Sequence, residues 1–369
     1  MAPSQPAHVN LSPAELSFLR SSLSQTPPIR LDNTKGPRDF RSMIAEYDVL
    51  PSTNGSARIA LEDGTEALVG VKAEVEKSQW RPNVEGRHTL SVAVGVDVDM
   101  ADDDGQEGEE NKGKGQNGWI EISVEIPGFR EDDALPVFLA SMLTESLLAS
   151  GELKDRLYIN QRFHWKLGID VLLLSPPLSY PLALLSMTTH LALLTAHLPA
   201  LKSEKDEDPL FDDDWDAAVP LYPKHDAQGG TNVDKPPIIV LAIAVGSNII
   251  FDPCKEELAV ADAVLAVGCA PSNASSTGAR IVSIRTIDPP AHLTPPAVPN
   301  SMNSATGGVA PASTADALTQ RELLSATGVW TPPRGGMKRS LISQVTSMVV
   351  GKGGVAEEVI AALQAIEVG

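Results

Sequence analysis

Residues 163–201 read FHWKLGIDVLLLSPPLSYPLALLSMTTHLALLTAHLPAL and say more about the architecture than any other part of the chain. From position 171 to the end of this stretch there is no Asp, Glu, Lys or Arg, and the length would suffice to cross a bilayer. However, three prolines interrupt its first third, and Ser, Thr and His side chains follow. We therefore predict a strand over 163–174, a proline turn, and a helix buried on most sides rather than a membrane span.

The sequence before this stretch predicts alternating strands and two helices. Apolar and polar residues alternate over 45–75, between turn sequences, which predicts an antiparallel meander with one buried face. A further alternating strand covers 119–126, and apolar residues at helical spacing predict a helix over 133–150. Near the N-terminus, Ser12 is placed to cap a short helix that ends at Leu23 and packs onto the main domain.

The sequence after this stretch predicts a second group of strands and a helical end. Hydrophobic runs at 237–245, 248–251 and 258–267 predict the strands of a second meander. The segment 338–368 has a helical pattern that glycines interrupt around Gly351, so we expect two helices there.

Together these elements predict an α+β fold with duplicated strand-helix units, because a meander followed by a helix occurs more than once. We divide the chain into an N-terminal helix and extension at 1–30, a core at 31–269, and C-terminal helices of that core at 336–369. Between them, residues 270–335 are rich in Ser, Thr, Pro, Ala and Gly. We expect this low-complexity insertion to be mostly disordered, with one possible strand at Arg280–Ile287.

Charge and its distribution exclude several classes of protein. The chain has 29 Lys and Arg against 48 Asp and Glu, a net charge of −19, which disfavours a generally basic nucleic-acid binder or an anionic-membrane coat. The acids concentrate in two insertions in the core, at 94–118 and 202–235, which we expect to stay solvated. Phe211 and Trp215 lie within the second insertion and indicate that this part is pinned to a surface.

Cysteine usage and the N-terminus indicate an intracellular setting. Cys254 and Cys269 provide no disulfide framework and no zinc ligand set, which fits a reducing compartment. The N-terminus lacks the basic and apolar regions of a signal peptide and is poor in Arg. We therefore expect a protein of the cytosol or nucleus.

A series of short motifs runs through the chain in a characteristic order. They are Ile29-Arg-Leu-Asp32, Pro37-Arg-Asp-Phe-Arg41, Leu50-Pro-Ser-Thr-Asn-Gly-Ser-Ala-Arg-Ile59, Glu62-Asp-Gly-Thr65, Ile169-Asp-Val-Leu172, the block from Phe211 to Asp216, and Phe251-Asp-Pro253. In order and spacing, though not singly, these motifs resemble the ribonuclease PH family, and most of all the ring subunits of the RNA exosome. The resemblance covers roughly residues 12–268 and the terminal helix, and it implies a ribonuclease PH-like fold.

The resemblance raises the question of catalytic activity. Active relatives degrade RNA from the 3′ end by phosphorolysis, which needs cations to hold phosphate and an acid near the leaving group. Where the family carries a Gly-Thr-Arg element, Ser175–Leu182 contains neither Gly nor Arg. Ser179 could donate one hydrogen bond there, but it cannot replace a guanidinium.

Two further elements of the family site are also altered or uncertain. The resemblance places the two catalytic acids at Glu256 and Asp262, or one position further on at Glu257 and Ala263, and we favour a solvated strand end as the role of Glu256 and Asp262. In active relatives, the helix that corresponds to 133–150 carries arginines that bind RNA phosphates. An anion at such a position would repel the phosphodiester backbone. The matching positions here are Ser141, Glu145 and Leu148.

We therefore expect no catalytic, cofactor-binding or metal-binding residues and no cofactor. The resemblance implies a non-catalytic structural subunit of the RNA exosome ring that supports 3′-to-5′ RNA processing and degradation, including ribosomal RNA maturation. It also implies other ribonuclease PH-like subunits in a hetero-hexameric ring, cap subunits with RNA-binding domains, a hydrolytic nuclease subunit, RNA in the assembled channel, no membrane, and a location in nucleus, nucleolus and cytoplasm. Two alternatives stay open: an active phosphate-dependent 3′-to-5′ exoribonuclease, and an acidic adaptor or chaperone unrelated to RNA.

Three remaining signals have simpler interpretations. The sequence Val350-Gly-Lys-Gly-Gly-Val355 lacks the first Gly and the final Ser or Thr of a phosphate-binding loop. His190 and His197 could ligate a metal only with partners that the sequence does not indicate, so core or interface histidines are favoured. Asp170 lies in an apolar strand, where burial would be costly without a hydrogen bond, and both a strand-end cap and a structural role shared across the family would explain it.

Overall fold

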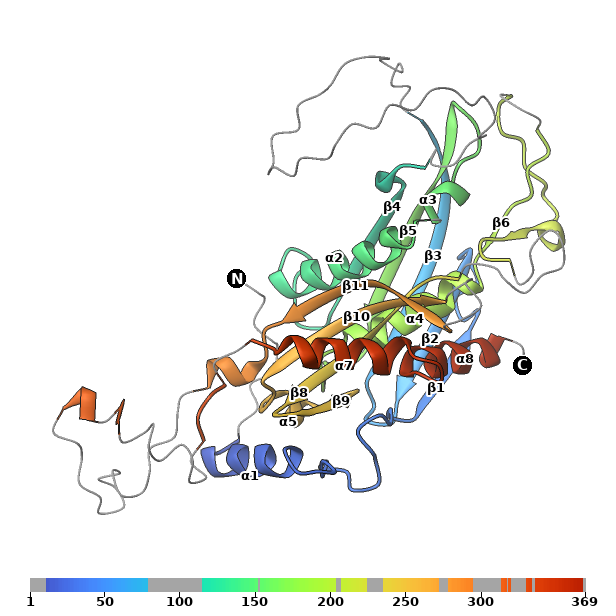
Figure 1. Cartoon of the computed structure of the whole chain (residues 1–369). Coiled ribbons are helices and arrows are strands. Elements are labelled where there is room, and N and C mark those ends of the chain that lie inside the picture. Colours follow the sequence, from blue (N-terminus) through green and yellow to red (C-terminus); the bar gives the residue numbers. More distant parts are fainter. Residues whose placement is uncertain are drawn as a thin grey trace, which may run out of the picture.

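The computed structural model of the chain describes residues 11–78, 115–151, 153–203, 207–223, 235–271, 278–294, 313–316, 318–319, 330–333 and 336–367. Two large β-sheets and a two-stranded ribbon contain the strands of this part, and helices pack between and around the large sheets (Figure 1). Within the described residues, no helix is long and apolar enough to cross a membrane. Most of the predicted acidic insertion at 94–118 lies outside the described residues.

The first sheet has five strands in the order β1-β2-β3-β5-β4. β1, β2 and β3 form the predicted antiparallel meander, and β5 pairs antiparallel with β3. β4 runs parallel to β5, and helix α2 (Ala134–Ala149) forms the crossover that a parallel pair requires. The strands are β1 (Met43–Tyr47), β2 (Gly55–Leu61), β3 (Glu66–Lys77), β4 (Ile120–Glu125) and β5 (Phe163–Leu173).

The second sheet has four antiparallel strands in the order β11-β10-β8-β9. The simple meander predicted here is wrong, because β10 pairs with β8 and not with β9. The predicted strand over 258–267 also starts too early: the short helix α5 comes first, with Glu257 accepting a hydrogen bond from the Cys254 N–H (3.0 Å), and it carries the chain to the other side of β8. The elements are β8 (Ile238–Val245), β9 (Asn248–Phe251), α5 (Lys255–Leu258), β10 (Ala263–Pro271) and β11 (Ala279–Ile287).

Helix α4 (Leu182–Leu194) lies between the two sheets, which explains why it carries no charge. All of its residues are buried, and it contacts β2 and β3 on one side and β8 on the other. Several of its polar side chains are hydrogen-bonded: Thr188 donates to the Leu184 carbonyl within the helix (2.8 Å), and Ser186 accepts from the Ile239 N–H of β8 (2.8 Å). The helix predicted to be buried on most sides is therefore confirmed.

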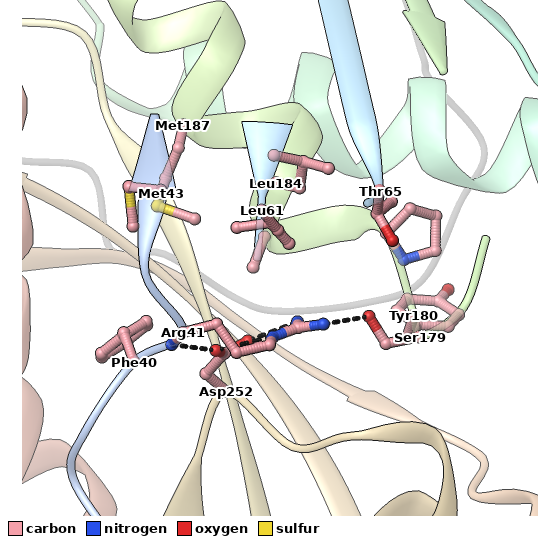
Figure 2. Close-up of a pocket in the computed structure, with 12 residues that line it drawn as sticks. Phe40, Arg41, Met43, Leu61, Thr65, Ser179, Tyr180, Leu184, Met187 and Asp252 are labelled. Atoms are coloured by element: carbon pink, nitrogen blue, oxygen red, sulfur yellow. Dashed lines mark hydrogen bonds and ion pairs between the residues drawn. The ribbon is translucent and has the colours of Figure 1, made fainter. Parts of the chain in front are cut away.

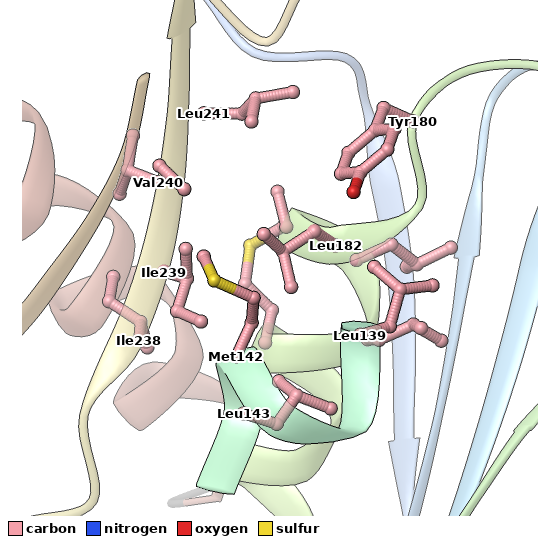
Figure 3. Packing of buried hydrophobic residues seen from close by; sticks show 14 of the residues in the cluster. Leu139, Met142, Leu143, Tyr180, Leu182, Ile238, Ile239, Val240 and Leu241 are labelled. Carbon is pink, nitrogen blue, oxygen red and sulfur yellow. The ribbon is translucent and has the colours of Figure 1, made fainter. Parts of the chain in front are cut away.

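The remaining helices cover the outside of the core. Side chains of α2, among them Leu139, Met142 and Leu143, point toward α4 and the start of β8 (Figure 3). The predicted pair of C-terminal helices is confirmed, with a break at the glycines between them. These and the short helical elements are α3 (Leu153–Arg156), α7 (Arg339–Val350), α8 (Val355–Glu367), η1 (Asn117–Trp119) and η3 (Pro290–Leu293).

The N-terminal segment packs on the second sheet. Helix α1 (Pro13–Leu23) starts at the predicted cap, since Ser12 and Glu15 exchange hydrogen bonds, and its three buried leucines face the core. The chain then follows β9: Asn248 Nδ2 donates to the Leu23 carbonyl (2.7 Å), and the Phe251 N–H donates to the Pro37 carbonyl (2.8 Å). This segment therefore covers the outer edge of the second sheet.

A two-stranded ribbon leaves the core after α4. β6 (His197–Leu198) pairs antiparallel with β7 (Val219–Pro220), and the 3₁₀ turn η2 (Trp215–Ala217) lies between them. The predicted pinning holds for Phe211, whose ring lies 4.9 Å from that of Trp165. It is wrong for Trp215, which is 54% exposed.

Trp330 shows that the predicted low-complexity insertion contributes at least one residue to the core. It is among the largest fully buried side chains, and its Nε1 donates to Thr294 Oγ1 (3.1 Å). The possible strand at Arg280–Ile287 is present as β11.

Candidate functional site

The loop of residues 174–181, which joins β5 to α4, is where the family resemblance places a phosphate-binding element. Ser175 Oγ accepts a hydrogen bond from the Glu66 N–H (3.0 Å) and ties the loop to β3. Ser179 Oγ accepts a hydrogen bond from Arg41 Nη1 (3.0 Å). The loop contributes no cation of its own, but it meets a guanidinium from a distant part of the chain.

Sequence reasoning missed the role of Arg41, the last residue of the motif Pro37-Arg-Asp-Phe-Arg41. It lies with Ser179 and Asp252 in a small pocket between the two sheets (Figure 2). Its Nε and Nη2 donate to the two carboxylate oxygens of Asp252 (2.9 and 2.6 Å), and its Nη1 donates to Asp63 (2.6 Å) as well as to Ser179. Four of the five N–H donors of the guanidinium are thus used inside the chain.

The electrostatics of the pocket favour these internal pairs. Burial opposes the positive charge of Arg41, but the carboxylates of Asp252 and Asp63 outweigh it and raise the pKa of the guanidinium. Burial likewise opposes the charge of Asp63, yet hydrogen bonds from Thr65 and the charge of Arg41 lower its pKa. With one cation against two carboxylates, the pocket has a formal negative charge.

Asp252 is held in place by the turn that follows β9. Its φ of 46° lies in the left-handed region, which Asp tolerates better than most residues. Arg30 Nη2 donates to the Asp252 carbonyl (2.9 Å), and the same guanidinium pairs with the buried Glu257 (2.8 Å). The Arg41 N–H also donates to the Asp252 carboxylate (2.8 Å). The carboxylate that faces Arg41 is therefore positioned by a second buried ion pair.

The two acids that the resemblance suggests, Glu256 and Asp262, have different surroundings. Asp262 accepts hydrogen bonds from Arg20 Nη2 (2.6 Å) and from the Gly246 N–H (2.7 Å), so it fastens α1 to the start of β10. The favoured interpretation as a solvated strand end is wrong for Asp262, because it is paired and only 23% exposed. Glu256 lies in the short helix α5 and is half-buried. Among the described residues that line the pocket around Arg41, neither acid appears.

The three positions on α2 offer no free cation. Glu145 forms an ion pair with Arg285 of β11, with 2.7 Å between Oε2 and Nη2. Ser141 is exposed and Leu148 is half-buried. The anion predicted on this helix is therefore present, but it is partnered by an arginine from the second sheet.

The remaining candidates, Asp170, His190 and His197, make hydrogen-bond contacts within the chain. Asp170 is exposed and accepts a hydrogen bond from Ser123 Oγ (2.8 Å), so it pays no burial penalty and is no strand-end cap. His190 is buried in α4 with its Nδ1 2.7 Å from the Pro236 carbonyl, whereas His197 lies in β6. No group of three or more potential metal ligands occurs in the described part of the chain.

Sequence comparison defines the class of this protein. The chain belongs to the ribonuclease PH family: residues 39–199 match the model of the 3′ exoribonuclease family, domain 1, and the fold is of that type.

Individual relatives narrow this class. The chain is 31% identical over 257 residues to the exosome complex component RRP42 of Saccharomyces cerevisiae, covering 69% of this chain and 79% of the relative. It is 29% identical over 283 residues to the exosome complex component rrp42 of Schizosaccharomyces pombe, covering 73% and 81%. A solved archaeal exosome core is 18% identical with a TM-score of 0.48, covering 74% of this chain and 84% of that one. The resemblance drawn from the sequence motifs is thus confirmed.

Proposed function

We propose that this chain is a structural subunit of an RNA exosome ring and does not itself catalyse phosphorolysis. The observation that carries the proposal is the pocket beside the Ser175–Leu182 loop, where Arg41 is enclosed by Asp252 and Asp63. A phosphate ion entering this pocket would have to compete with two carboxylates for the only guanidinium among its described lining residues.

Electrostatics explain why such a pocket does not support the reaction. Phosphorolysis needs a cation that is free to hold the attacking phosphate and to stabilise charge in the transition state. Losing one pre-organised donor costs about 3 kcal/mol, or on the order of a hundredfold in rate. Here the guanidinium is occupied, and Asp262, the acid that the resemblance suggests, is used to hold α1.

The core that builds the fold is intact, which supports a role in assembly. In the described residues, both sheets and the helix between them contribute to one hydrophobic core, and the relatives at about 30% identity are named as components of the exosome complex. We infer that the partners are other ribonuclease PH-like subunits of a hetero-hexameric ring, together with cap subunits, a hydrolytic nuclease and RNA in the channel. The proposed role is 3′-to-5′ RNA processing and degradation, including ribosomal RNA maturation.

The proposed location is the nucleus, nucleolus and cytoplasm. It follows from the proposed role in ribosomal RNA maturation, and two cysteines that form no disulfide fit reducing compartments. Fluorescence microscopy of a tagged chain, with co-purification and mass spectrometry of its partners, tests location and assembly together. A chain that purifies without any other ribonuclease PH-like protein would contradict the ring proposal.

The absence of catalysis is tested with end-labelled single-stranded RNA, with and without inorganic phosphate. We expect no phosphate-dependent shortening and no release of nucleoside diphosphates by the folded chain. In a ring reconstituted with the other subunits, Asp262→Asn should leave the rate of RNA shortening unchanged. Circular dichroism should confirm that the variant is folded. Phosphate-dependent shortening that Asp262→Asn abolishes would establish the exoribonuclease alternative instead.

A further inference from the structure

The ribbon after α4, residues 197–203 and 207–222, is attached firmly to the core at its base. The His197 N–H donates to the Asn54 carbonyl (2.8 Å), and Asn54 Nδ2 donates back to the His197 carbonyl (2.9 Å). Further out, the Lys202 N–H donates to the Leu210 carbonyl (2.7 Å), beside a separate antiparallel bridge between Leu201 and Phe211. The ribbon is therefore a built part of the fold that stands out beside the first sheet (Figure 1).

Large apolar side chains on this ribbon are exposed to solvent. The exposed fractions are 63% for Leu210, 56% for Val219, 54% for Trp215 and 45% for Leu201. Isolated exposed leucines are ordinary, but four large apolar side chains on one short ribbon, including a half-exposed Trp, are typical of a surface that binds a partner. The neighbouring Phe211 packs on Trp165, which shows that this part of the ribbon can bury an aromatic side chain against the core. Trp215 is nevertheless left exposed.

Six described acids lie between Leu201 and Val219 in the sequence, and two of them form ion pairs. Lys202 pairs with Asp212 (3.0 Å) and Arg162 pairs with Asp208 (3.1 Å). Four further acids on the ribbon form no ion pair with another described residue: Glu207, Asp213, Asp214 and Asp216. Asp214 Oδ1 accepts from the Asp216 N–H (3.1 Å), which fixes the turn that carries Trp215.

We propose that this ribbon binds a short basic segment of another polypeptide, in which arginine or lysine residues flank an apolar residue. The carboxylates would pair with the basic side chains, and one cation would stack on the exposed face of Trp215. The apolar residue would cover Leu210 or Val219. The same carboxylates repel a nucleic acid backbone, so the charge favours a peptide over RNA. This inference is independent of the absence of catalysis proposed above.

The test is fluorescence anisotropy with the full-length chain and a labelled peptide in which arginines flank two leucines. A matched peptide carries glutamine in place of every arginine. Trp215→Ser should weaken binding of the basic peptide about tenfold, because a central aromatic contact is lost, and Asp213→Lys should weaken it several-fold, with an effect that salt reduces. The glutamine peptide should bind at least tenfold more weakly than the basic one.

Control variants place an equivalent change elsewhere on the surface. Phe18→Ser removes an exposed aromatic from α1, and Asp132→Lys reverses an exposed acid before α2. Both should bind the basic peptide within twofold of the unaltered chain. Equal losses in the control variants, or no loss in Trp215→Ser, would overturn the proposal. So would loss of peptide binding when the chain is assembled with its ring partners, since a ring subunit would then cover the ribbon.

Discussion

Around Arg41, each charged side chain meets an opposite charge inside the chain, whereas the ribbon after α4 leaves several carboxylates without one among the described residues. The two regions lie on the same core and differ in what surrounds the charge. The pocket is enclosed between the two sheets, where an unpaired charge is costly, and the ribbon is in solvent, where it is not. The comparison indicates that the pocket contributes to stability and that the ribbon is available for recognition.

Among substitutions of charged side chains, the largest expected effect is that of Arg41→Ala, which would leave the carboxylate of Asp252 in the pocket without its partner. Removing one member of a buried ion pair costs about 3–5 kcal/mol. We expect a loss of this size in the free energy of unfolding, measured by urea denaturation. Arg58→Ala is the matched control, because Arg58 pairs with Glu46 and Glu66 at the surface and should cost less than about 1 kcal/mol. Similar losses in both variants would remove the distinction between pocket and surface.

A second prediction concerns Gly55, at the point where the ribbon joins the core. A Cβ at this position would lie 2.6 Å from the Ala192 carbonyl oxygen and 2.6 Å from the Ala196 Cα, both of which are backbone atoms. Gly55→Ala should therefore destabilise the chain by about 1–3 kcal/mol, as overpacking does. Gly168→Ala in β5 is the control, since its nearest neighbour would be the Lys72 carbonyl oxygen at 3.8 Å. Equal thermal stability of the two variants would contradict a tight junction at the ribbon base.

A third prediction tests whether the interior tolerates an unpaired charge, using pH. Burial lowers the pKa of His190 from 6.5 to about 4, so the unfolded chain takes up a proton below pH 6.5 while the folded chain resists it. As far as His190 is concerned, the free energy of unfolding is highest above pH 6.5. It decreases as the pH falls toward 4, by about 1–2 kcal/mol at pH 5. His190→Gln should show a smaller fall in thermal stability between pH 7 and pH 5. His164, whose pKa burial also lowers, remains in both proteins.

The parts of the fold that the sequence predicted are those that depend on local patterns. The alternation over 45–75, the cap at Ser12 and the glycines near Gly351 each specify a strand, a helix start or a helix break within a few residues. The charge-free helix was predictable for the same reason. In the second sheet, however, the partner of β10 depends on the crossover through α5, and hydrophobicity alone does not encode which strand it joins.

For the candidate site, the sequence predicted only which residues of the family pattern are missing. The missing Gly and Arg in Ser175–Leu182 are visible in the sequence, but the pairing of Arg41 with Asp252 joins residues more than two hundred positions apart. The solvated strand end predicted for Asp262 is wrong because no local pattern reveals that Arg20 reaches this carboxylate. Long-range ion pairs of this kind follow from the tertiary fold, and single-sequence reasoning has no signal for them.

The smallest expected effect on stability separates two tryptophans of this chain. Trp165 is buried against Phe211, and Trp165→Ser should cost about 3–5 kcal/mol of unfolding free energy, as large-to-small changes in a core do. Trp215 is half-exposed on the ribbon, and Trp215→Ser should change the unfolding free energy by less than about 0.5 kcal/mol, since surface substitutions rarely do more. Urea denaturation of the two variants decides the matter. If Trp215→Ser were as destabilising as Trp165→Ser, its side chain would serve the fold, and the contrast between a self-contained pocket and an open ribbon would fail.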